Sequence, residues 1–241
     1  MGIIDLPAVQ DYWSTSWPFQ TPHFSKLLSR DRFLLLLKFL HLADNNKQVA
    51  RGQPGYDKLF KLRPFIDPLI HSFKEMFVPQ QQLSIDEAMI SYKGRLSFLQ
   101  YLPKKPKKWG MKAWALADST LGYICNWKLY CWKEEEHGRE PLGERVVVEL
   151  LSGLEMKGYH VYFDNFYTSP TLCKRLFTLG FGSCGTVRLD RRGIPVTFKQ
   201  ATPNKGDITT YQDGNILGLK WKDKRYISVL STLHDDSMVS K

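Results

Sequence analysis

The order of strand-like and helix-like segments between Leu83 and Val187 restricts the fold of this chain more than any other feature. Apolar residues recur there with the periods of strands and helices, and turn residues separate the runs. In chain order the predicted segments are strands at 83–86, 111–120 and 123–132, a helix at 142–157, a strand at 159–164, a helix at 168–179 and a strand at 182–187. A strand that returns through a crossover helix needs a parallel neighbour in the same sheet. The sequence therefore predicts a mixed α/β domain.

The order of these segments matches an RNase H-like core, in which three antiparallel strands are followed by alternating helices and parallel strands. The preceding residues are predicted to be mainly helical, and the residues after Arg188 contain short β-rich runs. We therefore expect a helical region at 1–82 and the core at 83–188. A small β-rich insertion and the start of the next core segment are expected at 189–241.

Two helices of the N-terminal part are predicted in more detail. Ser29 can cap a helix over 29–44, and its apolar residues cover most of the circumference, which predicts burial on more than one side. A further helix is predicted over roughly 59–77, interrupted by Pro64 and Pro68.

Charge and composition restrict the partners of the chain. Its 34 Lys and Arg residues exceed its 24 Asp and Glu residues, which gives a net charge of +10. Such a balance favours a polyanionic partner, nucleic acid before an anionic membrane; the alternative is a basic soluble protein without one. The longest apolar run, 33–37, is too short to span a bilayer, and the N-terminus lacks a secretory signal. With four cysteines and no CxxC pair, we expect an intracellular protein with no membrane partner and no cysteine zinc site.

Two aspartates stand at the predicted ends of two strands. Asp86 ends the run LSID, and Asp164 ends the run VYFD. Functional groups of an open α/β sheet gather at the carboxyl ends of parallel strands, so adjacent strands would bring these carboxylates together. Close carboxylates repel each other and commonly hold a hard divalent cation, so the pair predicts a catalytic Mg²⁺ or Mn²⁺ site for phosphoryl transfer. The alternative is that each aspartate caps a turn where its strand ends.

Side chains beside each aspartate extend this hypothesis. Glu87 is expected to point to the opposite face of the strand from Asp86, where it would support the site without binding the metal. Asn165 lies just beyond the second aspartate and can hydrogen-bond its carboxylate or the loop backbone. Phe166 and Tyr167 are interpreted as packing residues.

A lysine-rich run lies between the two aspartates. The stretch YLPKKPKKWGMK contains no acid and embeds Trp109, so it offers phosphate contacts together with a ring on which a base can stack. The alternative is a solvated basic loop or part of a localisation signal. Beside a phosphoryl-transfer site, contact with DNA is the stronger interpretation. The predicted DNA-binding residues are Lys93, Arg95, Lys104, Lys105, Lys107, Lys108 and Lys112.

Several of these stretches together resemble a known family. LSIDEAMISYKGR, YLPKKPKKWGMK, ADSTLGYI, PLGERVVVEL, VYFDNFYTSP and GTVR occur in an order similar to piggyBac transposases and their domesticated, transposable element-derived relatives. The resemblance implies an RNase H-like DDE domain with three metal-binding aspartates, of which Asp86 and Asp164 match the first two. It also implies a helical dimerisation and DNA-binding region at 1–82, DNA as a partner, nuclear localisation and a homodimer as a possible assembly.

The resemblance is incomplete at the third aspartate. In the family this residue lies in a GGVD-type motif after a strand resembling YISVLST, and this sequence contains no GGVD. Asp235 and Asp236 match the acidic turn before that motif and are not assigned to the triad. We therefore expect a fragment or shortened domesticated product with the fold of a DNA-cleaving transposase and an incomplete catalytic site. The alternative is a non-catalytic DNA- or chromatin-binding protein.

Overall fold

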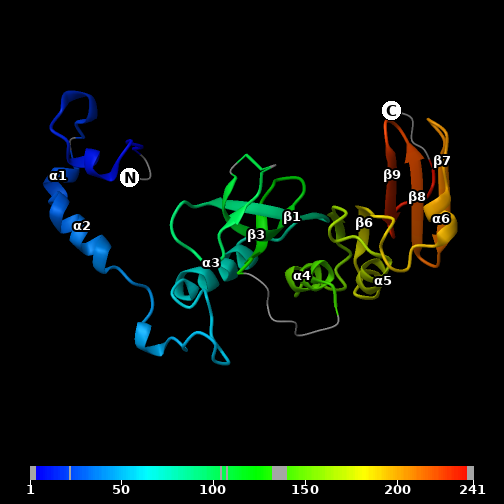
Figure 1. The fold of residues 1–241 in the computed structure, drawn as a ribbon, viewed down its shortest axis with the longest axis horizontal. Coiled ribbons are helices and arrows are strands. Elements are labelled where there is room, and N and C mark those ends of the chain that lie inside the picture. Colours follow the sequence, from blue (N-terminus) through cyan, green and yellow to red (C-terminus); the bar gives the residue numbers. More distant parts are fainter. Residues whose placement is uncertain (1–3, 22, 104, 107, 132–139, 238–241) are drawn as a thin grey trace. The chain divides into compact units, whose positions relative to one another are not determined.

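The chain forms two compact units, residues 1–66 and 67–241, which are described separately (Figure 1). The computed structural model describes residues 4–21, 23–103, 105–106, 108–131 and 140–237. Across these ranges, no helix is long and apolar enough to cross a membrane.

The N-terminal unit consists of short helices and turns. Ser29 acts as a helix cap as predicted, because its hydroxyl accepts a hydrogen bond from the Arg32 amide at 3.4 Å. The helices are α1 (Phe24–Leu27), α2 (Arg30–Phe39) and three 3-10 helices at Val9–Trp13, Trp17–Phe19 and Asn45–Lys47.

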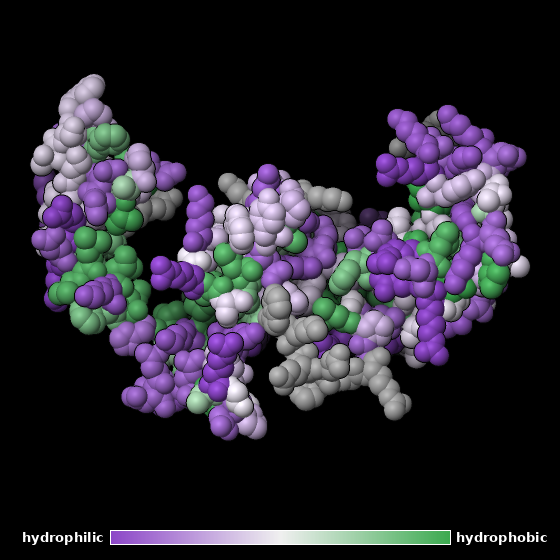
Figure 2. Space-filling model, in the orientation of Figure 1, coloured by the Kyte–Doolittle hydropathy of each residue, from purple (hydrophilic) through white to green (hydrophobic). Residues whose placement is uncertain are grey.

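Most apolar residues of α2 are exposed, so the expectation that this helix is buried on more than one side is wrong. Leu36 and Leu37 are 50% and 52% exposed, and Figure 2 shows apolar side chains gathered over this helix. The start of the helix does pack, since the ring centroids of Phe33 and Trp13 lie 5.1 Å apart. The described part of this unit contains no second long helix to cover the remaining faces.

Helix α3 (Arg63–Glu75) is shorter than the helix predicted around it. Pro64 lies in the first turn, where the backbone N–H that proline lacks would have no partner within the helix. Pro68 lies inside the helix.

The strands described in the larger unit pair into one nine-stranded sheet. Its strands are β1 (Gln82–Ser91), β2 (Gln100–Tyr101), β3 (Trp109–Asp118), β4 (Ile124–Leu129), β5 (His160–Phe163), β6 (Gly182–Thr186), β7 (Ile208–Asp213), β8 (Ile216–Lys222) and β9 (Tyr226–Ser231). They lie in the order β2-β3-β1-β5-β6-β9-β8-β7, and β4 pairs with β3. β1 is antiparallel to β3 and parallel to β5, which is in turn parallel to β6.

This topology confirms the predicted mixed α/β fold and its RNase H-like order. The antiparallel strands β1, β3 and β4 come first, and α4 (Leu142–Leu150) and α5 (Pro170–Thr178) then alternate with the parallel strands. α4 ends earlier than predicted, because turns around Gly153, at φ +91°, intervene before the expected cap at Gly158.

The strands after α6 (Val196–Gln200) continue the same sheet. β9 pairs antiparallel with both β6 and β8, so residues beyond the predicted core are joined to it by backbone hydrogen bonds. The division of the chain at residues 82 and 188 stays a prediction.

Helices α4 and α5 contribute to one apolar core with the central strands (Figure 1). Ile85 of β1 and Phe163 of β5 belong to this core and are 2% and 7% exposed. Because successive side chains of a strand point to opposite faces, the residue after each of them is directed away from the core. Packing under the sheet therefore decides where Asp86 and Asp164 point.

Candidate functional site

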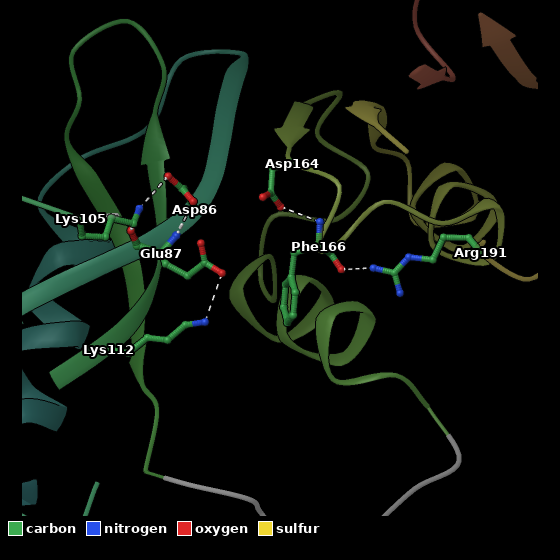
Figure 3. A network of polar contacts seen from close by, with 7 residues as sticks. All are labelled: Asp86, Glu87, Lys105, Lys112, Asp164, Phe166 and Arg191. Atoms are coloured by element: carbon green, nitrogen blue, oxygen red, sulfur yellow. Dashed lines mark hydrogen bonds and ion pairs between the residues drawn. The ribbon is translucent and has the colours of Figure 1, made fainter. Parts of the chain in front are cut away.

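The two predicted aspartates occupy adjacent positions in the sheet. Ile85 and Phe163 form the last parallel pair between β1 and β5, and Asp86 and Asp164 follow them directly. Both aspartates are exposed, and Figure 3 shows them on neighbouring elements. The expectation that Asp86 ends its strand is wrong, because β1 continues to Ser91 against the longer β3. What ends at this point is the pairing of β1 with β5.

Hydrogen bonds fix the loop that carries Asp164. The Phe166 amide donates to Asp164 Oδ1 at 2.9 Å, and Thr168 Oγ1 donates to the Asp164 carbonyl oxygen at 2.8 Å. From the segment after β6, Arg191 donates to the carbonyl oxygens of Asn165, at 3.1 Å, and of Phe166. Asn165 thus contributes its main chain, and a role for its side chain stays a prediction. No local pattern in the sequence links Arg191 to a loop 26 residues earlier, so its contacts could not be predicted.

Lys105 provides a counterion for Asp86. Its Nζ lies 3.6 Å from Asp86 Oδ2 and donates to the Glu87 carbonyl oxygen at 3.0 Å. The Lys105 and Asp86 side chains are 34% and 65% exposed, so this pair stabilises the fold by about 1 kcal/mol at most. One of the two aspartates therefore has a basic partner from the lysine-rich run.

Glu87 and Lys112 form a second, less accessible ion pair. Lys112 Nζ lies 3.2 Å from Glu87 Oε1, and the two side chains are 17% and 16% exposed. The same ammonium lies 5.6, 5.9 and 5.3 Å from the ring centroids of Trp114, Tyr130 and Phe166. Contact of Lys112 with DNA stays a prediction, and these neighbours lie around its ammonium.

Tyr167 is buried beside the three acids. It is 1% exposed, and its hydroxyl has no hydrogen-bond partner among the described residues. Burial first, and then the negative charges of Glu87, Asp164 and Asp86, raise the pKa of the phenol above its usual range. The interpretation of Tyr167 as a packing residue accounts for its ring, whereas no sequence signal indicates that its hydroxyl faces carboxylates.

Among the remaining predicted DNA-binding residues, Lys93 and Arg95 lie between β1 and β2, and Lys108 lies between β2 and β3. Lys93, Arg95 and Lys108 are exposed, so they are free to reach a phosphate. Lys104 and Lys107 fall outside the described residues. DNA contact by these residues stays a prediction.

An exposed aromatic pair stands next to the basic residues. Tyr101 and Trp109 are 49% and 54% exposed, and their ring centroids lie 4.9 Å apart at an interplanar angle of 44°. Trp109 was singled out in the sequence as a surface for a base, and β2 and β3 place Tyr101 opposite it. Exposed rings beside lysines are typical of surfaces that bind single-stranded nucleic acid.

Asp86 and Asp164 fit the requirements of a hard divalent cation. Both present carboxylate oxygens at exposed positions, and Mg²⁺ is typically bound by one or two carboxylates together with water and phosphate oxygens. In the part of the chain that the structure describes, no group of three or more His, Cys, Asp or Glu side chains is placed to hold a metal ion. The described acids thus offer two exposed carboxylates, and their role as metal ligands stays a prediction.

Comparison with known proteins identifies the family of the chain. A family model described as Transposase IS4 matches residues 1–241. The chain belongs to this transposase family. DDE transposases generally use divalent metal ions.

Relatives within this family are of the piggyBac type, which confirms the predicted resemblance. Human PiggyBac transposable element-derived protein 3 is 31% identical over 253 residues, covering 100% of this chain and 42% of the relative. Human PiggyBac transposable element-derived protein 2 is 27% identical over 246 residues, covering 95% and 40%. A cryo-EM structure of the piggyBac transposase synaptic complex with hairpin DNA matches with a TM-score of 0.80 and 28% identity, covering 92% of this chain and 47% of that chain. The chain therefore spans less than half the length of each of these relatives.

Proposed function

We propose that this transposase-family chain binds DNA and a divalent cation, Mg²⁺ or Mn²⁺, for metal-dependent DNA strand cleavage and transfer. The parallel pair of Ile85 and Phe163, which Asp86 and Asp164 directly follow in the chain, supports the proposal. A bound cation would polarise the scissile phosphodiester and lower the pKa of an attacking water or 3′-hydroxyl.

The chain's own residues have separate tasks in this proposal. Asp86 and Asp164 would hold the cation, and Arg191 would keep the Asp164 loop in place through its two carbonyl contacts. Lys105 neutralises Asp86 before a cation arrives, and can pair with a DNA phosphate when the cation takes its position. When metal and DNA bind, the cation would thus replace Lys105 beside Asp86, and Lys105 would pair with a phosphate instead.

The strength of catalysis depends on how many acids share the cations. Two carboxylates and a phosphate can hold one ion, whereas a second ion would be bound weakly by the same pair. Because electrostatic stabilisation of the transition state is usually the largest catalytic contribution, we propose cleavage slower by orders of magnitude than at a site with a third acid.

A nicking assay tests this function. Supercoiled plasmid and hairpin oligonucleotides would be incubated with Mn²⁺ and the wild-type chain, the Asp86→Asn/Asp164→Asn variant, or Asp223→Asn, which changes an exposed aspartate in the turn between β8 and β9. We expect slow cleavage by the wild type and by Asp223→Asn, and none by the double variant. Cleavage that persists in the double variant would refute the site.

A non-catalytic DNA-binding function is the second candidate. It is favoured by the exposed surface of Lys93, Arg95, Lys108, Tyr101 and Trp109, which needs no metal to meet a polyanion. Fluorescence anisotropy with labelled DNA at several salt concentrations separates the candidates. Salt-dependent binding that survives Asp86→Asn/Asp164→Asn, without any cleavage by the wild type, would select this second function.

We also propose a homodimer formed through the N-terminal unit, and action in the nucleus. The exposed leucines of α2 support self-association, because a contiguous apolar surface is stabilised when a second copy covers it. Light scattering after size-exclusion chromatography should give a dimer for the wild type and for Leu121→Gln, whose leucine is exposed in a hairpin turn. Leu36→Gln/Leu37→Gln should be monomeric.

Imaging of a fluorescent fusion of the chain tests the proposed nuclear location.

A further inference from the structure

Lys112 contacts both segments that carry the aspartates (Figure 3). Its Nζ lies 3.2 Å from Oε1 of Glu87, the residue after Asp86, and 5.3 Å from the ring centroid of Phe166, which lies two residues after Asp164. The Phe166 amide in turn donates to Asp164 Oδ1 at 2.9 Å. A single lysine of β3 therefore connects β1 to the loop after β5.

The surroundings of Lys112 restrict its ammonium to this position. Glu87 faces it from β1, and the rings of Trp114 and Tyr130 add contacts at 5.6 and 5.9 Å. Removal of either member of a mostly buried ion pair leaves the other charge without compensation, so Glu87 and Lys112 are stable there as a pair. This environment is typical of a structural cation rather than of a lysine that binds phosphate.

The Tyr167 hydroxyl adds a donor at the same place. The residue is buried, its hydroxyl has no hydrogen-bond partner among the described residues, and after burial the negative charge of Glu87 contributes most to raising the pKa of its phenol. A buried hydroxyl without a hydrogen bond is costly, so a small movement that lets it donate to Glu87 would be favourable. Lys112 holds that carboxylate within reach.

We propose that Lys112, Glu87 and Tyr167 form a positioning unit that holds Asp86 and Asp164 together for a divalent cation, and that Lys112 does not contact DNA. The inference rests on the proposed metal-binding function of the two aspartates. The unit contains one cation, one anion and the neutral phenol of Tyr167. It would therefore set the geometry of the aspartates without adding net charge to the site.

A charge-neutral double variant provides the main test. Glu87→Gln/Lys112→Met removes the ion pair without changing net charge, so a change in cation affinity reports geometry rather than electrostatics. We expect the Kd for Mn²⁺, measured by isothermal titration calorimetry, to rise about tenfold, as for other residues that orient metal ligands. Lys128→Met/Glu149→Gln, which removes a 2.8 Å ion pair between β4 and α4, should leave the Kd unchanged. An unchanged Kd in the first variant would overturn the proposal.

Hydrogen exchange gives a readout that needs no metal. The Phe166 amide should exchange roughly tenfold faster in Glu87→Gln/Lys112→Met than in the wild type or the control, because the loop loses its tie to β3. If the wild type binds no Mn²⁺, the proposed function fails, and this measurement still decides whether Lys112 orders the Asp164 loop. Should the double variant not fold, Tyr167→Phe keeps the ring and is expected to weaken Mn²⁺ binding about threefold.

The salt dependence of DNA binding tests whether Lys112 contacts a phosphate. Loss of a phosphate contact lowers the slope of log affinity against log salt concentration by about 1. We expect that reduction for Lys108→Met, whose lysine is exposed in the same run, and no reduction for Glu87→Gln/Lys112→Met. Equal reductions in both variants would identify Lys112 as a phosphate contact and overturn its assignment.

Discussion

Asp118 and the pair Asp86 and Asp164 show two uses of aspartate in one sheet. At the end of β3, Asp118 is 0% exposed and accepts three backbone amides at 2.7 to 2.9 Å. Asp86 and Asp164 are exposed, although each also accepts a nearby backbone amide. The chain satisfies the first carboxylate, whereas the other two keep exposed lone pairs, and their use as metal ligands stays a proposal.

The difference teaches how to separate a structural aspartate from a candidate ligand. Asp86 and Asp164 stand at predicted strand ends, and Asp118 ends β3, so a turn-capping role is reasonable for each of them. Asp118 fulfils that role completely. Asp164 fulfils it in part, since one oxygen caps the turn at Phe166 while the side chain stays exposed.

Substitution of either exposed aspartate should change binding much more than stability. We expect Asp86→Asn and Asp164→Asn each to weaken Mn²⁺ binding by about 100-fold or more, because a charged ligand is lost rather than a supporting residue. The melting temperature should stay within about 2 °C of the wild type. Calorimetric titration and melting on the same samples check both values, and a large loss of stability without weaker binding would make these aspartates structural.

Substitution of Asp118 should have the converse effect. Asp118→Ala removes the acceptor of three amides, so the melting temperature should fall by on the order of 10 °C. The Kd for Mn²⁺ of the folded fraction should not change. Asp223→Ala, at an exposed turn, serves as the control, and a melting temperature close to the wild type in both variants would contradict this assignment.

The pH dependence of stability should follow Asp118. Hydrogen bonds from the Leu121 and Gln80 amides hold the pKa of this carboxyl below its usual range. A group with a lowered folded-state pKa stabilises the fold above its unfolded pKa, about 3.9, and loses that contribution as the pH falls through the folded value. Thermal melts below about pH 4 should therefore show a steeper decline for the wild type than for Asp118→Asn. Parallel declines would exclude this role.

Substitution of Lys105 should give the smallest effect. It tests whether the Lys105 ammonium competes with a metal cation for the Asp86 carboxylate. Lys105→Met removes the counterion 3.6 Å from Asp86 Oδ2, so Mn²⁺ affinity should rise, by up to about threefold given the weakness of exposed pairs. The salt slope of DNA binding should fall by about 1. The same titrations measure both, and weaker Mn²⁺ binding would show that Lys105 supports the metal site instead of competing with it.

Local patterns were sufficient for the framework of the site. Alternation of apolar residues along 83–86 and 159–164, with an amphipathic helix between them, led to neighbouring parallel strands and to Asp86 and Asp164 at their junction. These features depend on residues close together in the chain, so periodicity and turn residues reveal them. The ordered blocks that resemble piggyBac transposases were readable for the same reason.

Local patterns could not predict contacts between residues that lie far apart in the sequence. Lys112 belongs to a basic run, yet Glu87, 25 residues earlier, and Phe166 from a later loop turn it inward. Arg191 reaches back to the Asp164 loop, and within the described residues the leucines of α2 lack the covering helix that their pattern suggests. A residue's type and spacing determine which strand or helix carries it and in which order these elements pair. The neighbours across the sheet decide whether its charge faces water or a counterion, because solvation and electrostatic pairing depend on distances in space.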